Sequence, residues 1–370
     1  MIYLPTRLLK PGMILARDVP SANPILSLMV TGQTLDTRSI QKVEARGIKG
    51  LYVAFDGLDD IEFQEFLDPS ERQKMLSDIK NMFDKVEKHD ALPDFQSVSR
   101  MAESLVLNVL HHDMLLCSIS DIRDYDGYTY AHSLSVAIMS VKLGRQLKLA
   151  PLRLNELAAA GLLHDIGKLE IPHQIIDKNG PLSDEEYNMV KEHPDRGEQR
   201  LRHVPGCNPA IIRGVSTHHE YYNGGGYTKG LEGERIPLYG RILAIADVFD
   251  ALSSNRSYRK AWSPSKVVDY LTSRAGTQFD PELLPSFLNC VIAYPPGMLV
   301  KLSDDSVGVI IKNHQGLPLR PVIRLLAPEA RKGQELDLAS QGLHITVLDM
   351  VGDPAEASSL RLSPDAKNNG

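Results

Sequence analysis

The chain has 370 residues, 42% of them hydrophobic, and a formal net charge of −6. This length exceeds what one hydrophobic core usually supports, so we expect a soluble protein with more than one domain. The acidic balance argues against a broad surface for large nucleic acids but leaves room for a local basic pocket that binds a small phosphorylated ligand.

The cysteines and the apolar segments define the expected compartment. Cys117, Cys207 and Cys290 are widely spaced and form no CxxC pattern, which argues against a disulfide framework and against a cysteine zinc site. The opening MIYLPTRLLKPGMIL lacks the apolar core of a signal peptide, and no run of about 18 or more apolar residues occurs. We therefore expect a cytoplasmic protein with no membrane span.

The first 114 residues predict two segments of different character. Residues 1–60 contain short apolar runs broken by Pro-Gly and Thr-Gly turns, with one helical stretch near 36–46, and this pattern predicts a small β-rich accessory domain. Residues 61–114 are more charged and place apolar residues at helical spacing, which predicts connecting helices.

Residues 115–290 carry the pattern of successive helices. Ser183 with Glu186 forms a capping box, and Asn208 before a proline supplies a helix start. Beyond this block, β-branched runs over 291–352 predict a small antiparallel β extension, and 353–370 predict a disordered tail. The predicted fold class is therefore mainly α, with small β-containing N-terminal and C-terminal segments.

The helical block carries histidines and aspartates on otherwise apolar segments. His164 and Asp165 end the stretch AAAGLLHD, His218 and His219 are adjacent, and Asp247 lies within RILAIADVFDAL. One such histidine is usually a core residue bonded to backbone, but unpartnered polar groups in this number would be costly, and a bare buried carboxylate is disfavoured without a cation. Imidazole and carboxylate suit Fe, Mn, Ni or Zn, and adjacent ligands can supply two neighbouring metals that activate water at a phosphoryl group.

The same residues lie within motifs that resemble a known family. The motifs are HDIGK at 164–168, KEHPDRG at 191–197, HHEYYNGGGY at 218–227, RILAIADVFDAL at 241–252 and NRSYRKAW at 255–262. Together they resemble the HD-GYP family over roughly 115–290. The resemblance implies an HD-type helical bundle and a metal-dependent phosphodiesterase that cleaves cyclic dinucleotides, chiefly cyclic di-GMP, in bacterial signalling.

The resemblance also implies roles for individual residues. It implies two divalent metal ions, Fe or Mn first and Ni, Mg or Zn as alternatives, with Asp165 bridging them and Lys168 beside the scissile phosphate as the catalytic residues. The implied metal ligands are His164, Asp165, His193, His218, His219 and Asp247. The implied substrate contacts are Lys168, Tyr227, Asp250, Arg256 and Arg259, although both arginines could instead pair with surface carboxylates.

Three positions depart from the family pattern. His132 matches a position that reaches a third metal in some members, but the carboxylate expected four residues earlier is Tyr128, so we expect two metals with His132 as an indirect or weak ligand. Asn223 replaces an aspartate, and Thr228 replaces the proline of the GYP loop. Loss of the proline frees the backbone there, which could change substrate fit or contacts with partners such as GGDEF-type cyclases.

The expected reaction is hydrolysis of cyclic di-GMP to pGpG, with a further cut to GMP left open, by a hydroxide that the two metals activate. One alternative is an effector that binds a cyclic dinucleotide without turnover. Another is a phosphodiesterase that prefers cyclic GMP-AMP. An HD-type phosphohydrolase for nucleotides or alarmones would not need the histidine pair and the glycine loop. A homodimer is left open.

Overall fold

The computed structural model describes residues 1–20, 27–46, 48, 50–58, 60–61, 67, 69–111, 117–118, 128–178, 180–254 and 261–351. These residues form two compact units. The helical unit lies within Lys74–Cys117 and Gly127–Val291. The mixed unit lies within Met1–Gln73, Ser118–Asp126 and Ile292–Gly370.

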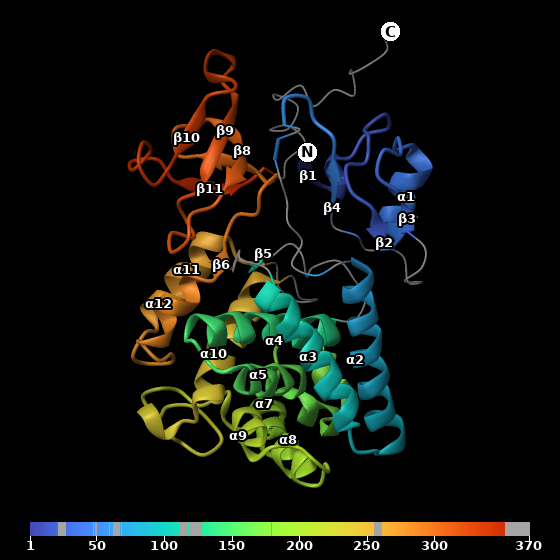
Figure 1. Cartoon of the computed structure of the whole chain (residues 1–370), viewed down its shortest axis with the longest axis vertical. Helices are drawn as coiled ribbons and strands as arrows, with labels where there is room; N and C mark the ends of the chain where they lie inside the picture. Colours follow the sequence, from blue (N-terminus) through green and yellow to red (C-terminus); the bar gives the residue numbers. More distant parts are fainter. Residues whose placement is uncertain are drawn as a thin grey trace. The chain divides into compact units, whose positions relative to one another are not determined.

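The helical unit is the larger of the two and contains the residues of the predicted site. Figure 1 shows its helices. Its N-terminal helices are α2 (Pro69–His89), α3 (Phe95–His111), α4 (Tyr128–Gln146) and α5 (Pro151–Leu163). The short elements η3 (Ile166–Glu170), α6 (His173–Ile176), α7 (Asp184–Lys191) and α8 (His193–Arg202) follow. The remaining elements are α9 (Pro209–Thr217), η4 (Gly233–Arg235), α10 (Leu238–Ser253), α11 (Pro264–Ser273) and α12 (Leu283–Leu288).

Helix α5 is the central element because nearly all of its C-terminal half is apolar. Its residues from Leu157 to Leu163 are all buried, and it packs against α3, α4 and α9. A helix that is apolar all round must be covered on every side. Gly161 lets α4 approach closely, since a Cβ at this position would lie 2.5 Å from the Cα of Ala137. Helix α10, equally apolar, packs on α4 and α9 and completes the layer around the site.

Both helix starts predicted from capping residues are confirmed. The side chain of Ser183 accepts from the backbone of Glu186 at 3.2 Å, and the Glu186 carboxylate accepts from the Ser183 amide at 2.7 Å. Asn208 accepts from the amide of Ala210 at 2.8 Å, and α9 begins at the following proline. Each cap satisfies an amide that the helix itself leaves without a partner.

The mixed unit combines segments from both ends of the sequence. Strand β1 (Ile2–Pro5) pairs antiparallel with β4 (Gly50–Val53), β2 (Val19–Pro20) pairs with β3 (Ser27–Met29), and η1 (Thr6–Leu8) and α1 (Thr37–Ala45) complete the N-terminal part. An antiparallel five-stranded sheet has the order β10-β9-β8-β7-β11. Its elements are β7 (Leu299–Leu302), β8 (Val307–Lys312), β9 (Val322–Ala327), η5 (Glu329–Arg331), β10 (Glu335–Asp337) and β11 (Val347–Met350).

The two parts of the mixed unit share one hydrophobic core. Leu4, Val43 and Leu51 from the N-terminal part lie in the same buried cluster as Leu299 and Val309 from the sheet. The N-terminal and C-terminal β segments, which were predicted as separate parts, therefore pack into one core. The boundaries of the five segments predicted from the sequence stay a prediction. Strands β5 (Cys117–Ser118) and β6 (Val291–Ile292) occur where the sequence passes between the units.

The predicted fold class is confirmed: the chain is mainly helical, with small sheets in its N-terminal and C-terminal segments. The predicted helix near 36–46 is α1, capped by Asp36. The predicted disordered tail lies outside the described residues. Among the helices that the structure describes, none has both the length and the apolar composition needed to cross a bilayer.

Candidate metal centre

Three histidines are fixed just beyond the last turns of helices. His164 follows α5, His193 follows the last turn of α7, and His218 follows α9. In each ring Nδ1 donates to the carbonyl oxygen three residues earlier, at 2.8, 2.7 and 2.6 Å respectively. The last carbonyls of a helix lack partners within it, so each ring satisfies one of them. The accepting carbonyls belong to Gly161, Val190 and Val215.

This arrangement decides which ring nitrogen is free to act as a ligand. A carbonyl can only accept, so Nδ1 must carry the proton in all three rings. Burial lowers the pKa of His193 to about 3 and that of His218 to about 4, so both rings are neutral near pH 7. The Nε2 atoms of His193 and His218 therefore present bare lone pairs, and a backbone bond at Nδ1, which all three rings make, is typical of histidines that bind metals.

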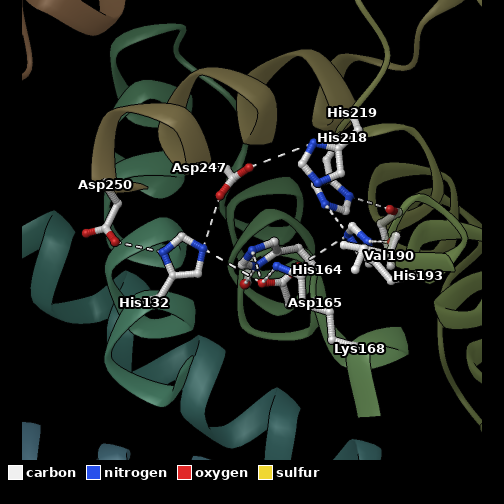
Figure 2. Close-up of polar contacts among 12 residues, drawn as sticks. His132, His164, Asp165, Lys168, Val190, His193, His218, His219, Asp247 and Asp250 are labelled. Atoms are coloured by element: carbon white, nitrogen blue, oxygen red, sulfur yellow. Dashed lines mark hydrogen bonds and ion pairs between the residues drawn. The ribbon is translucent and has the colours of Figure 1, made fainter. Parts of the chain in front are cut away.

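Asp165 lies at the centre of the cluster (Figure 2). Its Oδ2 atom is 3.3 Å from Nε2 of His164, and its Oδ1 atom is 3.4 Å from Nε2 of His193. Lys168, one turn along η3, donates to Oδ2 at 2.6 Å and keeps 30% of its side chain exposed. Burial would raise the pKa of Asp165, but its interactions with His164 and Lys168 outweigh burial and hold the pKa well below its usual range.

Helices α4 and α10 supply the opposite side of the cluster. Nε2 of His132 lies 3.1 Å from Oδ1 of Asp247 and 3.8 Å from Oδ2 of Asp165, while Nδ1 is 2.7 Å from Oδ2 of Asp250 (Figure 2). Nδ1 of His219 lies 4.0 Å from the second oxygen of Asp247. The side chain of His132 is 3% exposed and that of His219 is 21% exposed, so the cluster opens towards His219.

The carboxylates around His132 control its proton. Burial lowers the pKa of His132, but hydrogen bonds to Asp247 and Asp250 outweigh it and raise the pKa to about 9. The pKa of Asp247 is held well below its usual range because the bond to His132 outweighs the effect of burial. Without a metal, the cluster therefore holds a proton between these groups, and a cation that binds there would displace it.

The donor set fits divalent metal ions. Nε2 of His193 and Nε2 of His218 lie 3.3 Å apart, and since both rings are protonated on Nδ1, their lone pairs face each other. This contact is unfavourable unless a cation lies near both atoms. Nε2 of His164 and Oδ1 of Asp165 make no hydrogen bond to any residue in the described ranges. Imidazole with carboxylate suits Fe, Mn, Ni or Zn.

The donor atoms fall into sets that overlap. Within each set the atoms lie no more than 4.8 Å apart. The sets are His193, His218 and His219; His132, His164 and Asp247; and His164, Asp165 and His218. All the ligands predicted from the sequence are thus brought together, and His132 lies among them rather than outside them.

The glycine-rich loop lies beside His219. The Tyr227 ring stacks on that of His219, with centroids 4.8 Å apart and planes at 28°. Asn223 accepts from the amide of Gly225 at 3.0 Å. An aspartate could accept the same bond, so the asparagine retains this turn. Thr228 donates to Oδ1 of Asp195 on α8 at 2.7 Å.

The predicted substrate contacts are only partly described. Arg256 and Arg259 lie outside the described residues. Asp250 is buried with its carboxylate on His132, and its contact with substrate stays a prediction. Sequence reasoning gave no role to Glu220, which is 2% exposed and accepts from two loop amides. The sequence signal that could have identified Glu220 is its position, because a carboxylate directly after the histidine pair can accept hydrogen bonds from the glycine loop that follows.

Similarity to known proteins agrees with this geometry. Residues 119–283 match the HD domain family, and residues 299–343 match a KOW domain associated with HD domains. A Pseudomonas aeruginosa protein named as a cyclic di-GMP phosphodiesterase is 33% identical over 272 residues, which cover 72% of this chain and 65% of that protein. A Vibrio cholerae protein named 3'3'-cGAMP-specific phosphodiesterase 2 is 35% identical over 161 residues, covering 43% of this chain and 31% of that protein.

A solved structure of an HDG"Y"P protein from Bdellovibrio bacteriovorus is also similar. Its TM-score is 0.49 at 15% identity, and the match covers 77% of this chain and 97% of that one. The chain spans less than two thirds of the length of the two curated relatives named above.

The helical unit gathers buried histidines and aspartates around one point, in an arrangement that could hold metal ions. Residues 119–283 are similar to the HD domain family. The predicted resemblance is confirmed by this match and by relatives named as cyclic di-GMP phosphodiesterases.

Proposed function

We propose that the chain is a metal-dependent phosphodiesterase that hydrolyses cyclic di-GMP. The observation that carries the proposal is the facing pair of bare Nε2 atoms of His193 and His218, 3.3 Å apart in a buried cluster of further donors. A core built for packing alone would avoid such a contact. The name of the Pseudomonas relative supports the choice of substrate.

The proposed centre holds two divalent metals, with Fe or Mn as first choices. Asp165 suits a bridging position because its two oxygens face different histidines, His193 and His164. His132 is grouped with His164 and Asp247, so metal counting decides whether it is a further ligand. The proposed ligands are His164, Asp165, His193, His218, His219 and Asp247.

When bound, such metals would activate water and offset charge on a phosphoryl group. The protein's own residues then position the substrate. The ammonium of Lys168, held by Asp165 at 2.6 Å, supplies a fixed positive charge beside the cluster for the transition state. Tyr227 forms a wall over His219 on the open side. The expected product is pGpG, and a second cut would release GMP.

A second candidate substrate is 3'3'-cyclic GMP-AMP, since Vibrio relatives are named for it. The two substrates share the phosphodiester ring and differ in one base, so the metal cluster does not distinguish them. A non-hydrolysing effector would have no use for so complete a donor set, which favours an enzyme.

The test is hydrolysis of both cyclic dinucleotides by protein purified without oxygen and supplied with Mn or Fe(II). The parent is compared with the double variant His164→Ala, Asp165→Ala, and with His173→Ala, whose side chain is 71% exposed, as a matched control. We expect turnover in the parent and the control and none in the double variant, which should also lose metal. Turnover in the double variant, or none in a fully metallated parent, would refute the proposal.

Contacts with GGDEF-type cyclases, a homodimer and a cytoplasmic location are further proposals from the family resemblance. Size-exclusion chromatography of the metallated chain, alone and with a GGDEF cyclase, tests the first two.

A further inference from the structure

The loop that carries Tyr227 is anchored at three side chains. The hydroxyl of Thr228 donates to Oδ1 of Asp195 at 2.7 Å. The amides of Lys229 and Leu231 donate to the two carboxylate oxygens of Glu220, at 2.6 and 3.0 Å. In addition, the ammonium of Lys229 pairs with Glu198 on α8.

The anchors connect the loop to segments that carry the cluster. Asp195 lies two residues after His193 on α8, and Glu220 directly follows His219. The amide of Tyr227 donates to the carbonyl oxygen of His219 at 3.1 Å, and its ring stacks on the same histidine. The loop therefore contacts His219, at the open side of the cluster, through both backbone and ring.

The bond to Asp195 differs from the other anchors because it acts next to Tyr227. Glu220 holds the loop beyond Thr228, at the next residue and at Leu231, so that part stays fixed without Asp195. A threonine at 228 leaves the backbone torsion free where a proline ring would restrict it. A hydroxyl bonded to a carboxylate is stronger than a bond between neutral groups and can restore this restraint.

We propose that Thr228 and Asp195 are positioning residues, which fix the Tyr227 ring on His219 and so shape the substrate side of the centre. Neither residue belongs to the donor sets found among the described residues, so both act through Tyr227. This inference rests on the proposed function for its substrate, but the contact itself can be tested without turnover.

The kinetic test uses isosteric variants of the metallated full chain. Thr228→Val removes the hydroxyl, and Thr228→Ser retains it as a matched control. We expect Thr228→Val to raise KM for cyclic di-GMP about fivefold, the loss expected for one hydrogen bond, with kcat changed less than about twofold. Thr228→Ser, which keeps the hydroxyl, should stay close to the parent, whereas Asp195→Asn, which keeps an acceptor but loses the charge, should raise KM by less than Thr228→Val.

A double-mutant cycle separates the contact from general loop damage. Combining Thr228→Val with Asp195→Ala should raise KM no further than either single change, because each removes the same bond. Multiplying effects would overturn the proposal, as would an unchanged KM in Thr228→Val with full metal content.

Amide hydrogen exchange gives a readout that is independent of activity. In the metallated protein without nucleotide, the Tyr227 amide should exchange about fivefold faster in Thr228→Val and at the parent rate in Thr228→Ser. Unchanged exchange in Thr228→Val overturns the positioning role even if the enzyme is active. Faster exchange in a chain that cleaves no cyclic dinucleotide supports the contact and refutes only the proposed substrate.

Discussion

Gly167→Ala tests how closely η3, which directly follows His164 and Asp165, must pack against α8. Gly167 lies in η3, two residues after Asp165, and its backbone meets the start of α8. A Cβ here would collide with the carbonyl oxygen of His193 and would lie 2.5 Å from the amide nitrogen of Gly197. Both are backbone atoms, so no side-chain rotation can relieve the contact, and η3 and α8 would have to separate.

The expected cost follows from that geometry. Overpacking a well-filled core typically costs 1–3 kcal/mol, and a clash with two backbone atoms lies at the upper end, so we expect a loss of about 3 kcal/mol. Gly197→Ala is the matched control on the other side of the contact. Its Cβ would lie 3.2 Å from a methyl of Val215 and 3.3 Å from one of Ile166, contacts that small side-chain shifts relieve. Alanine also favours a helix over glycine by about 1 kcal/mol.

Urea unfolding of the metal-free chains, followed by circular dichroism at 222 nm, measures the free energy, and elemental analysis of the reloaded chains measures metal. Because Asp165 precedes η3 and His193 begins α8, separation should also lower the metal content of Gly167→Ala. The reasoning would be wrong if this variant matched Gly197→Ala in both stability and metal content.

Three further predictions concern the charged groups. In the metal-free chain the pKa values of His193, about 3, and His218, about 4, lie below the 6.5 of an unfolded histidine. The contribution of these two rings to the free energy of unfolding is therefore fully present above pH 6.5. It should fall towards pH 4 by about 1.4 kcal/mol per pH unit for each ring, and urea midpoints that are equal at pH 6.5 and 5 would contradict this. Glu220→Gln should speed exchange of the two loop amides that Glu220 accepts, and unchanged rates would assign the loop's order to other contacts. Asp250→Asn should lower the pKa of His132 from about 9 in the metal-free chain, measured by NMR titration, whereas an unchanged pKa would leave Asp247 as its sole determinant.

The residue types and their spacing were enough to single out candidate ligands, while the family resemblance supplied the complete ligand set and the roles of its members. Helix starts such as that of α9 follow from local capping chemistry, which depends on neighbours in sequence. The candidate ligands could be chosen because charged groups on apolar segments require partners. The close approach of His132 to Asp247 could not be predicted from one sequence, since it depends on how α4 and α10 pack.

Contacts between distant segments were the least predictable. The absence of a proline at Thr228 predicted a freer loop, yet its hydroxyl finds Asp195, 33 residues earlier. Nothing in local spacing connects these positions. In the same way, the alternating burial of β1 and the continuous apolar run of β8 indicate strands that are covered, but not that the N-terminal part and the sheet share a core.

The backbone bonds of the three helix-end histidines link metal geometry to helix length. Each ring is oriented by a carbonyl of its own last turn, so the direction of Nε2 depends on where α5, α7 and α9 stop. One inserted residue would rotate the following side chain by about 100° and turn the lone pair away from the centre. Related sequences should therefore accept insertions in the connections 177–183 and 203–208 and exclude them from the last turns of these helices.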